Sequence, residues 1–485
     1  MNPIILETIL VCIGFFLLMV EAFCGSVHKS VIGYAALIGI AGVLTLTFFV
    51  TPSAMNPMAA YSHYYSADSL AIFFKQFTLV ATFCVLVMML EFTPVLQRFL
   101  PSAVNGAGVG EFYTIPLFTC AGMMWLVSAT DFILLFVALE LVTISFYILV
   151  AYMRRSPASL EAGVKYLILG ALSTGFIVYG IAWIFGVFGT TSLPEIVSLL
   201  PRLNPAAYTS TLFGLGLILV AIGFKVGAVP FQFWIPDVYQ GAPTPISAFL
   251  AVASKAVGFV VLLRVLQPFL AVPFLAQKLL LVIAVLSAAT MLFGNLASLP
   301  QTNFKRLLAY SSIAHAGYLL MGVASVSSGI SGYAVSFYLA VYLIMTMLAF
   351  AVTIVVSNAC GRDNISNFNG LGKKSPWLAA ALTIGTLSLA GLPFTAGFFG
   401  KFFIFEAAVA ARLYPLVMIG AGSVACGFYY YLKVIRAMYW MPVSTTEAGS
   451  APCKVSFLLG LMIAILSILT LVFGVYPAPL FALMR

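Results

Sequence analysis

Six ionisable residues stand inside long apolar stretches of this sequence. They are Glu140, Lys165, Lys225, Lys255, His315 and Lys401. An ionisable side chain near the middle of a bilayer costs at least about 2.5–3.5 kcal/mol on insertion scales, so it is expected only where it serves a function. Four of the six are lysines and none is an arginine. The protonation state of lysine shifts readily, whereas arginine would stay charged. This choice of residue favours proton transfer.

A glutamate and two lysines of this set could form a switchable proton site. Glu140 lies near the middle of its apolar stretch, and Lys225 and Lys255 fall in two later, neighbouring stretches. Burial disfavours the charged form of each group, whereas a nearby opposite charge favours it. Pairing would therefore keep a lysine protonated, and separation would favour proton release. The alternative is a static ion pair that holds helices together.

The other buried candidates leave alternatives open. Lys165 closely follows two loop arginines, so its side chain could instead extend to the membrane interface. His315 can relay protons because histidine titrates near neutrality, but a hydrogen-bonded packing histidine is the alternative. Glu7 and Lys75 lie near the ends of apolar stretches, and we expect their charges to reach the interface. No role is assigned to Glu406.

Two of the lysines stand beside interruptions rich in Gly and Pro. Lys225 lies in Gly223-Phe-Lys-Val-Gly-Ala-Val-Pro230, and Lys401 ends a segment that begins at Gly391 and contains Pro393. Interrupted helices in corresponding halves of a chain indicate an inverted-repeat transporter, whose broken helices expose backbone dipoles at the ion site. A simple proline kink is the alternative at each position.

The elements that carry these residues are predicted to be membrane helices. Of 485 residues 63% are hydrophobic and 7% charged, and the mean hydropathy is +1.14, whereas soluble domains have about 25% charged residues. Continuous apolar runs such as Leu279–Leu286 exclude the alternating pattern of a membrane β-barrel. We predict an all-α integral membrane protein with about fourteen spans: 3–23, 31–50, 69–95, 113–128, 131–152, 161–187, 208–229, 243–266, 277–298, 304–325, 332–357, 376–410, 415–440 and 455–482.

The net charge of +9 indicates membrane orientation rather than binding of nucleic acid, because the basic residues are dispersed. The loops after odd-numbered spans hold most of them: Lys29, Arg98, Arg154, Arg155, Lys305, Arg306, Arg362, Lys373, Lys374 and Lys454. Loops after even-numbered spans hold Arg202 and Arg412, with Arg264 and Lys278 at helix ends nearby. Cytoplasmic loops are enriched in Lys and Arg. We therefore expect both termini on the outer side.

Two long motifs resemble the signatures of proton-conducting membrane subunits. The first runs from Gly223 to Pro245 and is followed by Ala253-Ser-Lys255, and the second runs from Gln301 to His315. The stretch Asp237-Val-Tyr-Gln-Gly-Ala-Pro resembles subunit N of the proton-pumping NADH–quinone oxidoreductases, the respiratory complex I family. Sister subunits L and M and the multisubunit cation/proton antiporters typically have His-x-x-Glu-Ala-Pro there. The likeness extends from about residue 65 to 440.

This resemblance implies an architecture of two inverted five-helix repeats, each with one broken helix. The implied regions are 1–112 for the first three helices, 113–266 for the first antiporter-like repeat, 277–440 for the second and 441–485 for the C-terminal helix. The interruptions at Pro230 and Pro393 would be the breaks in the seventh and twelfth helices.

The resemblance also implies roles for the charged residues. Glu140 would modulate Lys225 of the broken seventh helix, and Lys165 would be the lysine of the sixth helix. Lys255 would connect the two half-channels. Lys401 would stand at the outward exit, with His315 on the hydrophilic axis between them. One departure is Gln232, which occupies the place of a histidine in the motif. Since glutamine cannot titrate, a relay through that position is in doubt.

The implied function is proton translocation coupled to quinone reduction in partner subunits. The sequence contains no Gly-rich dinucleotide loop and no cysteine set for an iron–sulfur cluster, and its few histidines predict no metal site. Flavin, iron–sulfur clusters and quinone are therefore expected in partners, namely peripheral subunits and neighbouring antiporter-like and small membrane subunits. We expect a location in the cell inner (plasma) membrane. The alternatives are a component of a multisubunit cation/proton antiporter and a non-conducting scaffold.

Overall fold

The computed structural model describes residues 4–23, 29–50, 64–100, 108–361, 363–442 and 454–484, so Arg362 lies outside the described residues. Within these ranges the regular elements are helices, joined by loops that form three isolated β-bridges. Helices satisfy all their backbone hydrogen bonds internally, which a chain in lipid requires. The prediction of an all-α membrane protein is confirmed.

Twelve helical segments in the described residues are long and apolar enough to cross a membrane. They are α1 (Ile4–Phe23), α2 (Lys29–Thr47), α3 (Ser69–Leu96), α5 (Phe132–Val150), α6 (Pro157–Phe188), α8 (Tyr208–Val226), the continuous run of α10 (Thr244–Phe249), η4 (Leu250–Ser254) and α11 (Lys255–Leu266), α12 (Pro273–Ser298), α13 (Phe304–Ala324), α14 (Ser331–Cys360), α18 (Tyr414–Trp440) and α20 (Phe457–Val475).

Several further helices complete the bundle. The longer ones are α4 (Val109–Ser128), α16 (Pro376–Ala390) and α17 (Ala396–Ala410), and the short ones are α7 (Leu193–Leu199), α9 (Trp234–Gly241), α15 (Leu371–Lys374) and α21 (Ala478–Ala482). The predicted total of about fourteen spans depends on whether α4 and the α16–α17 pair also cross the membrane. That total stays a prediction.

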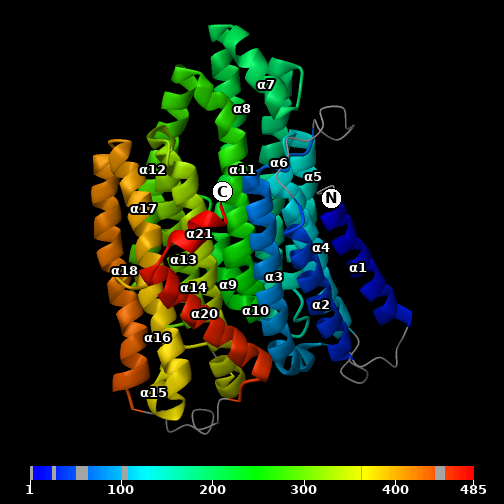
Figure 1. The fold of residues 1–485 in the computed structure, drawn as a ribbon, viewed down its shortest axis with the longest axis vertical. Helices are drawn as coiled ribbons and strands as arrows, with labels where there is room; N and C mark the ends of the chain where they lie inside the picture. Colours follow the sequence, from blue (N-terminus) through cyan, green and yellow to red (C-terminus); the bar gives the residue numbers. More distant parts are fainter. Residues whose placement is uncertain are drawn as a thin grey trace.

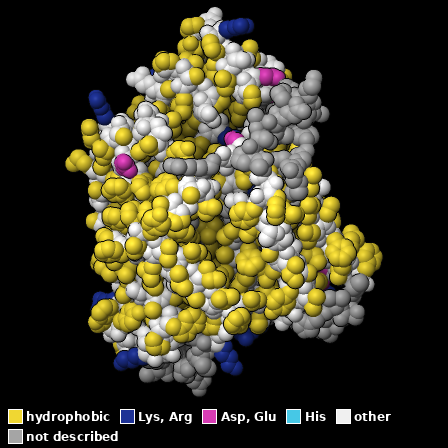
Figure 2. Space-filling view, in the orientation of Figure 1, with side chains coloured by type: hydrophobic (Ala, Val, Ile, Leu, Met, Phe, Trp, Pro, Cys, Tyr) yellow, Lys and Arg dark blue, Asp and Glu magenta, His cyan; other side chains and the backbone are white. Residues whose placement is uncertain are grey.

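The helices stand side by side along the long axis of the molecule, and α20 crosses the bundle obliquely (Figure 1). The central helices α13 and α14 and the α10–α11 run are buried along nearly their whole length. Outer helices such as α1, α6 and α20 expose large apolar side chains, and Figure 2 shows hydrophobic side chains covering most of this face. Such a surface is suited to lipid.

The two ends of the bundle differ in charge. α15, which carries Lys373 and Lys374, lies at the lower end in Figure 1, and several Lys and Arg side chains are visible there in Figure 2. α7, which precedes Arg202, lies at the opposite end. This distribution agrees with a basic end formed by the loops after odd-numbered spans.

Both interruptions predicted from Gly and Pro are present. α8 ends at Val226 and α9 begins at Trp234, and α16 ends at Ala390 and α17 begins at Ala396. Each preceding helix ends at a glycine with positive φ, +79° at Gly227 and +92° at Gly391, a conformation that glycine adopts without steric cost. Because each gap spans several residues, these are breaks rather than kinks.

One break falls in each of the two predicted repeats, 113–266 and 277–440. The inverted relation between the repeats, and the division at 1–112 and 441–485, stay predictions.

Candidate functional site

Lys225 lies in the last turn of α8 and reaches across to α5. Its Nζ donates a hydrogen bond to the Thr143 hydroxyl. Glu140 lies three residues earlier on the same face of α5 and accepts a hydrogen bond from the Thr174 hydroxyl at 2.7 Å. The ion pairs among the described residues do not include Lys225 with Glu140 within 4 Å. The structure therefore shows this pair separated, with Thr143 as the lysine's partner.

Lys255 is the first residue of α11 and follows a π-helical turn, η4. Such turns are rare and often found at functional sites. The Lys255 Nζ donates to both the main-chain oxygen and the hydroxyl of Ser312 on α13. The Tyr342 ring centroid lies 5.8 Å from the same nitrogen. The side chain of Lys255 thus links the start of α11 to α13.

Lys401 lies after the second break, in α17, and reaches back to the helix before it. Its Nζ donates to the main-chain oxygens of Leu389 at 2.9 Å and Ala390 at 2.6 Å, at the end of α16. The last carbonyls of a helix lack intrahelical partners and carry the negative end of its dipole. The Tyr318 ring centroid lies 5.2 Å from the lysine nitrogen. The break therefore exposes the carbonyls that bind Lys401, and we call these two carbonyls the seat of Lys401.

Helix α13 carries a row of polar groups between the last two lysines. Ser312, which contacts Lys255, is followed at three-residue spacing by His315 and Tyr318, so the three share one face of the helix. His315 Nδ1 lies 2.6 Å from the Tyr338 hydroxyl of α14, and its Nε2 lies 3.2 Å from the Tyr431 hydroxyl of α18. A chain of hydroxyls and an imidazole thus lies between the two sites.

Three of the buried lysines share one property. Lys225, Lys255 and Lys401 are 8%, 1% and 7% exposed, and in the part of the chain that the structure describes none has a carboxylate within 4 Å. Their partners are neutral oxygens. A buried charge without a counter-charge is costly, so the neutral form of such a lysine becomes accessible.

Lys165 differs from the other candidates. Its side chain is 43% exposed and forms ion pairs of 2.7 Å with both Glu161 and Asp237. Asp237 also accepts from Arg306 at 2.8 Å, so this polar network joins α6, α9 and α13 at the surface. The structure does not bring Lys165 into the buried row, which favours the interface alternative. Its role in translocation stays a prediction.

Two other lysines lie deeper than the sequence suggested. The expectation that Glu7 and Lys75 reach the interface is wrong: they are 0% and 1% exposed and pair with each other at 2.8 Å. The reason is that α1 and α3 both pack on α2 and α4 and turn these side chains inward. Lys305, counted above as a loop cation, is also buried, and its Nζ lies 3.7 Å from Asp363.

The sequence analysis missed the hydroxyl partners of the lysines and of His315. Helical spacing would have found two of them, because Thr143 lies three residues after Glu140 and Ser312 three residues before His315. Tyr338 and Tyr431 come from other helices, and no local pattern indicates them.

Gln232, the departure from the motif, lies in the first break. It is 2% exposed, and its Oε1 has no hydrogen-bond partner among the described residues. Within the same ranges, no group of three or more His, Cys, Asp or Glu side chains gathers as a metal site would.

Comparison with known proteins identifies the family of this chain and agrees with its fold. The family described as NADH:quinone oxidoreductase/Mrp antiporter, TM, matches residues 129–428. The chain is 42% identical over 445 residues to the NADH-quinone oxidoreductase subunit N of Trichlorobacter lovleyi, covering 91% of this chain and 88% of that one. It is 39% identical over 457 residues to subunit N of Heliobacterium modesticaldum, covering 93% and 91%.

Solved structures agree. A chain of respiratory complex I from Thermus thermophilus with bound aureothin superposes with a TM-score of 0.79 at 31% identity, covering 98% of this chain and 97% of that one. A chain of the Mrp complex from Dietzia superposes with a TM-score of 0.84 at 18% identity, covering 100% and 96%, which shows a shared fold alone. The chain therefore belongs to the NADH:quinone oxidoreductase/Mrp antiporter family and, within it, to the subunit N branch of the NADH–quinone oxidoreductases.

Proposed function

We propose that this subunit N translocates protons across the membrane through a row of buried groups. The row consists of Glu140, Lys225, Lys255, His315 and Lys401, with Lys165 at its margin. The observation that carries the proposal is the set of neutral oxygens around Lys225, Lys255 and Lys401. A purely structural lysine would be expected to pair with a carboxylate, whereas a lysine that releases its proton needs a neutral partner.

The transfer begins at Glu140 and Lys225. When Lys225 moves from Thr143 toward Glu140, the carboxylate holds it protonated; when it returns to the hydroxyl, it releases its proton toward Lys255. The proton then passes along α13. Ser312 and His315 lie between the lysines, and hydroxyl and imidazole groups both accept and donate hydrogen bonds.

Lys401 is the last member of the row, and its seat on the freed carbonyls of α16 keeps it positioned for release. We place the outward exit here. In this orientation the basic end with Lys373 and Lys374 faces the cytoplasm and both termini lie outside, in a cell inner membrane.

The redox chemistry belongs to other subunits of the complex. Flavin, iron–sulfur clusters and quinone would be held by peripheral and membrane partners, including neighbouring antiporter-like and small membrane subunits. This chain would receive the energy of quinone reduction as a conformational or electrostatic change at Glu140 and Lys225.

A second candidate function is that of a component of a cation/proton antiporter driven without redox input. The matching family includes Mrp antiporters, which favours it, whereas the identity to subunits named N argues against it. A sodium gradient should then change the activity of the complex. A scaffold function would allow apolar residues at the three lysines without loss of pumping.

The test is quinone-dependent proton pumping in membrane vesicles that carry Lys225→Ala. We expect the complex to assemble and both pumping and oxidoreductase activity to fall at least about tenfold, because a positioned proton-transfer group is lost. The matched control is Lys278→Ala, which removes an exposed lysine from α12. Parental activity of Lys225→Ala in an assembled complex would contradict the proposal.

A further inference from the structure

A second buried ionisable cluster lies in the N-terminal helices. Glu7 Oε1 lies 2.8 Å from Lys75 Nζ and accepts from the Tyr65 hydroxyl at 3.0 Å, and Lys75 also contacts Tyr65. Glu7, Tyr65 and Lys75 are 0%, 3% and 1% exposed. All three lie outside residues 129–428, the part that matches the family. The function proposed above does not use them.

Only one of the two carboxylate oxygens of Glu7 has a partner among the described residues. Both of its contacts fall on Oε1, and the buried Oε2 has no hydrogen-bond partner among the described residues. A buried carboxylate oxygen left without a partner costs free energy, more so when the group is charged. A proton bound at this oxygen would remove the buried charge. Glu7 is therefore equipped to accept a proton as well as to pair with Lys75.

Few other ionisable groups face this carboxylate. From α4 the thiol of Cys120 lies near enough for the two to interact. From α2 the nearest cation is Lys29, which pairs with Glu21 at the opposite end of α1. The site therefore depends mainly on Lys75 and Tyr65.

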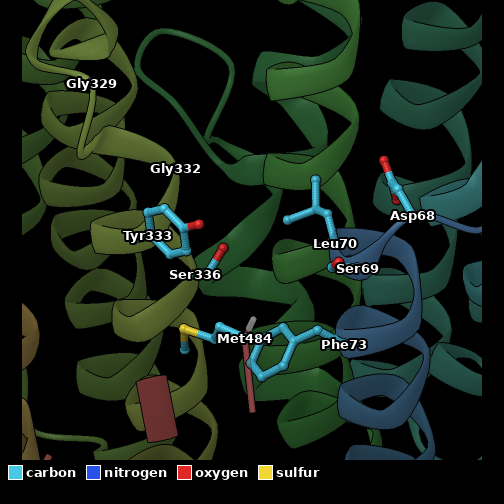
Figure 3. Close-up of a pocket in the computed structure, with 9 residues that line it drawn as sticks. All are labelled: Asp68, Ser69, Leu70, Phe73, Gly329, Gly332, Tyr333, Ser336 and Met484. Carbon is cyan, nitrogen blue, oxygen red and sulfur yellow. The ribbon is translucent and has the colours of Figure 1, made fainter. Parts of the chain in front are cut away.

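The start of α3, close to this cluster, is partly exposed. Asp68 lies seven residues before Lys75, which is two helical turns or about 10 Å along the same face. Its side chain is 46% exposed. A cavity of about 340 Å³ lies beside it; Figure 3 shows Asp68 and Ser69 at the start of α3, across from Tyr333 and Ser336. This turn is therefore the accessible rim of the cluster.

The same turn is tied to the central row. Arg264 Nη2 lies 2.6 Å from Asp68 Oδ1, and the charges of both residues act on Lys75. Arg264 lies near the end of α11, whose first residue is Lys255. One helix thus joins the central lysine to the rim of the N-terminal cluster.

We propose that Glu7, Tyr65 and Lys75 form an additional proton-binding site, which exchanges protons with water at Asp68 and is linked to the central row through α11. The ligand is the proton itself, carried on the free oxygen of Glu7. This inference rests on the proposed function, because it adds a site to a translocating subunit. The competing explanation is a static clamp between α1 and α3.

Replacing both charges separates the two explanations. The variant Glu7→Leu with Lys75→Met leaves no unpaired charge, and replacing a buried ion pair by apolar residues is often neutral or stabilising. We expect the whole complex to assemble and proton pumping in vesicles to fall about tenfold. The matched control, Glu21→Leu with Lys29→Met, removes the other ion pair of α1 and should pump at the parental rate.

Parental pumping by the assembled Glu7→Leu/Lys75→Met complex would show a static clamp and overturn the proposal. If that variant does not assemble, the pH profile of pumping by Glu7→Asp distinguishes a proton-binding site from a static clamp. This substitution keeps a carboxyl group but changes its position. A shifted pH profile of pumping supports the site, and a profile identical to the parent overturns it. Lys225→Ala in the same kind of vesicles separates the two proposals. If Lys225→Ala lowers pumping and the Glu7 variants do not, this inference alone fails. If Lys225→Ala has no effect on pumping, the proposed function fails.

Discussion

The two broken helices hold their lysines in different ways. Lys225 lies before its break, and its partner Thr143 belongs to a separate helix, α5. Lys401 lies after its break, and its partners are the last carbonyls of α16, which is joined to it by the break itself. One lysine contacts a neighbour that can move away, and the other contacts the other half of its own interrupted helix.

This difference assigns separate tasks to two similar sequence patterns. In the proposed function, a relative movement of α5 and α8 would exchange Thr143 for Glu140 as the partner of Lys225, so this site would be a switch. The carbonyls that bind Lys401 belong to the other half of the same broken helix. In the proposed function this lysine would therefore keep its partners rather than exchange them. The following predictions test that contrast.

The largest effect is expected from Lys401→Arg. Arginine could still bind the freed carbonyls, but it does not release its proton. Pumping should therefore fall about a hundredfold, as in Lys401→Ala, because the proton-transfer step is lost in both. The measurement is proton uptake by vesicles with assembly checked. Lys433→Arg, which changes a lysine that donates to the Gln301 carbonyl, is the control. Parental pumping by Lys401→Arg would mean that charge alone matters there.

A smaller loss is expected from Thr143→Val. Valine removes the neutral partner of Lys225 and leaves the lysine free to remain near Glu140, so pumping should fall about tenfold, in line with a hydrogen bond to a charged group. Thr143→Ser keeps the hydroxyl and should pump near the parental rate. Equal rates for the valine and serine variants would show that the hydroxyl is not part of the switch.

Gly391→Ala should mainly affect stability. Residue 391 has φ +92°, and an added Cβ would lie 2.9 Å from Lys401 Cδ. We expect a loss of about 1–2 kcal/mol from the strained backbone, seen as a lower thermal midpoint of the purified complex, with a few-fold loss of pumping. Gly422→Ala on α18, where a Cβ meets nothing within 4 Å, is the control. An unchanged midpoint for Gly391→Ala would argue against a rigid seat.

The smallest effect is expected from Gln232→His. Gln232 is buried in the first break, its Oε1 lacks a hydrogen-bond partner within the described part of the chain, and the proposed transfer does not pass through it. Pumping at pH 7 should stay within about twofold of the parent, and any new dependence on pH should fall between about 5 and 8, where histidine titrates. A tenfold gain or loss would place position 232 on the proton route.

Local patterns in the sequence were sufficient for the helices and the breaks. The predicted spans 69–95 and 332–357 correspond to α3 (Ser69–Leu96) and α14 (Ser331–Cys360), because the length of an apolar run is itself the signal in lipid. The breaks beside Lys225 and Lys401 were predictable because glycine and proline act on the backbone at their own positions.

The partners of the charged groups were not predictable in this way. Glu140 and Lys225 were expected as a pair, yet Thr143 is the contact of the lysine; Glu7 and Lys75 were expected at the interface, yet they pair with each other. Where the long helices run and where two of them break was determined by the sequence alone, since this depends on neighbouring residues. Which side chains meet was decided only by the tertiary structure, because helix rotation and packing bring together residues far apart in the chain.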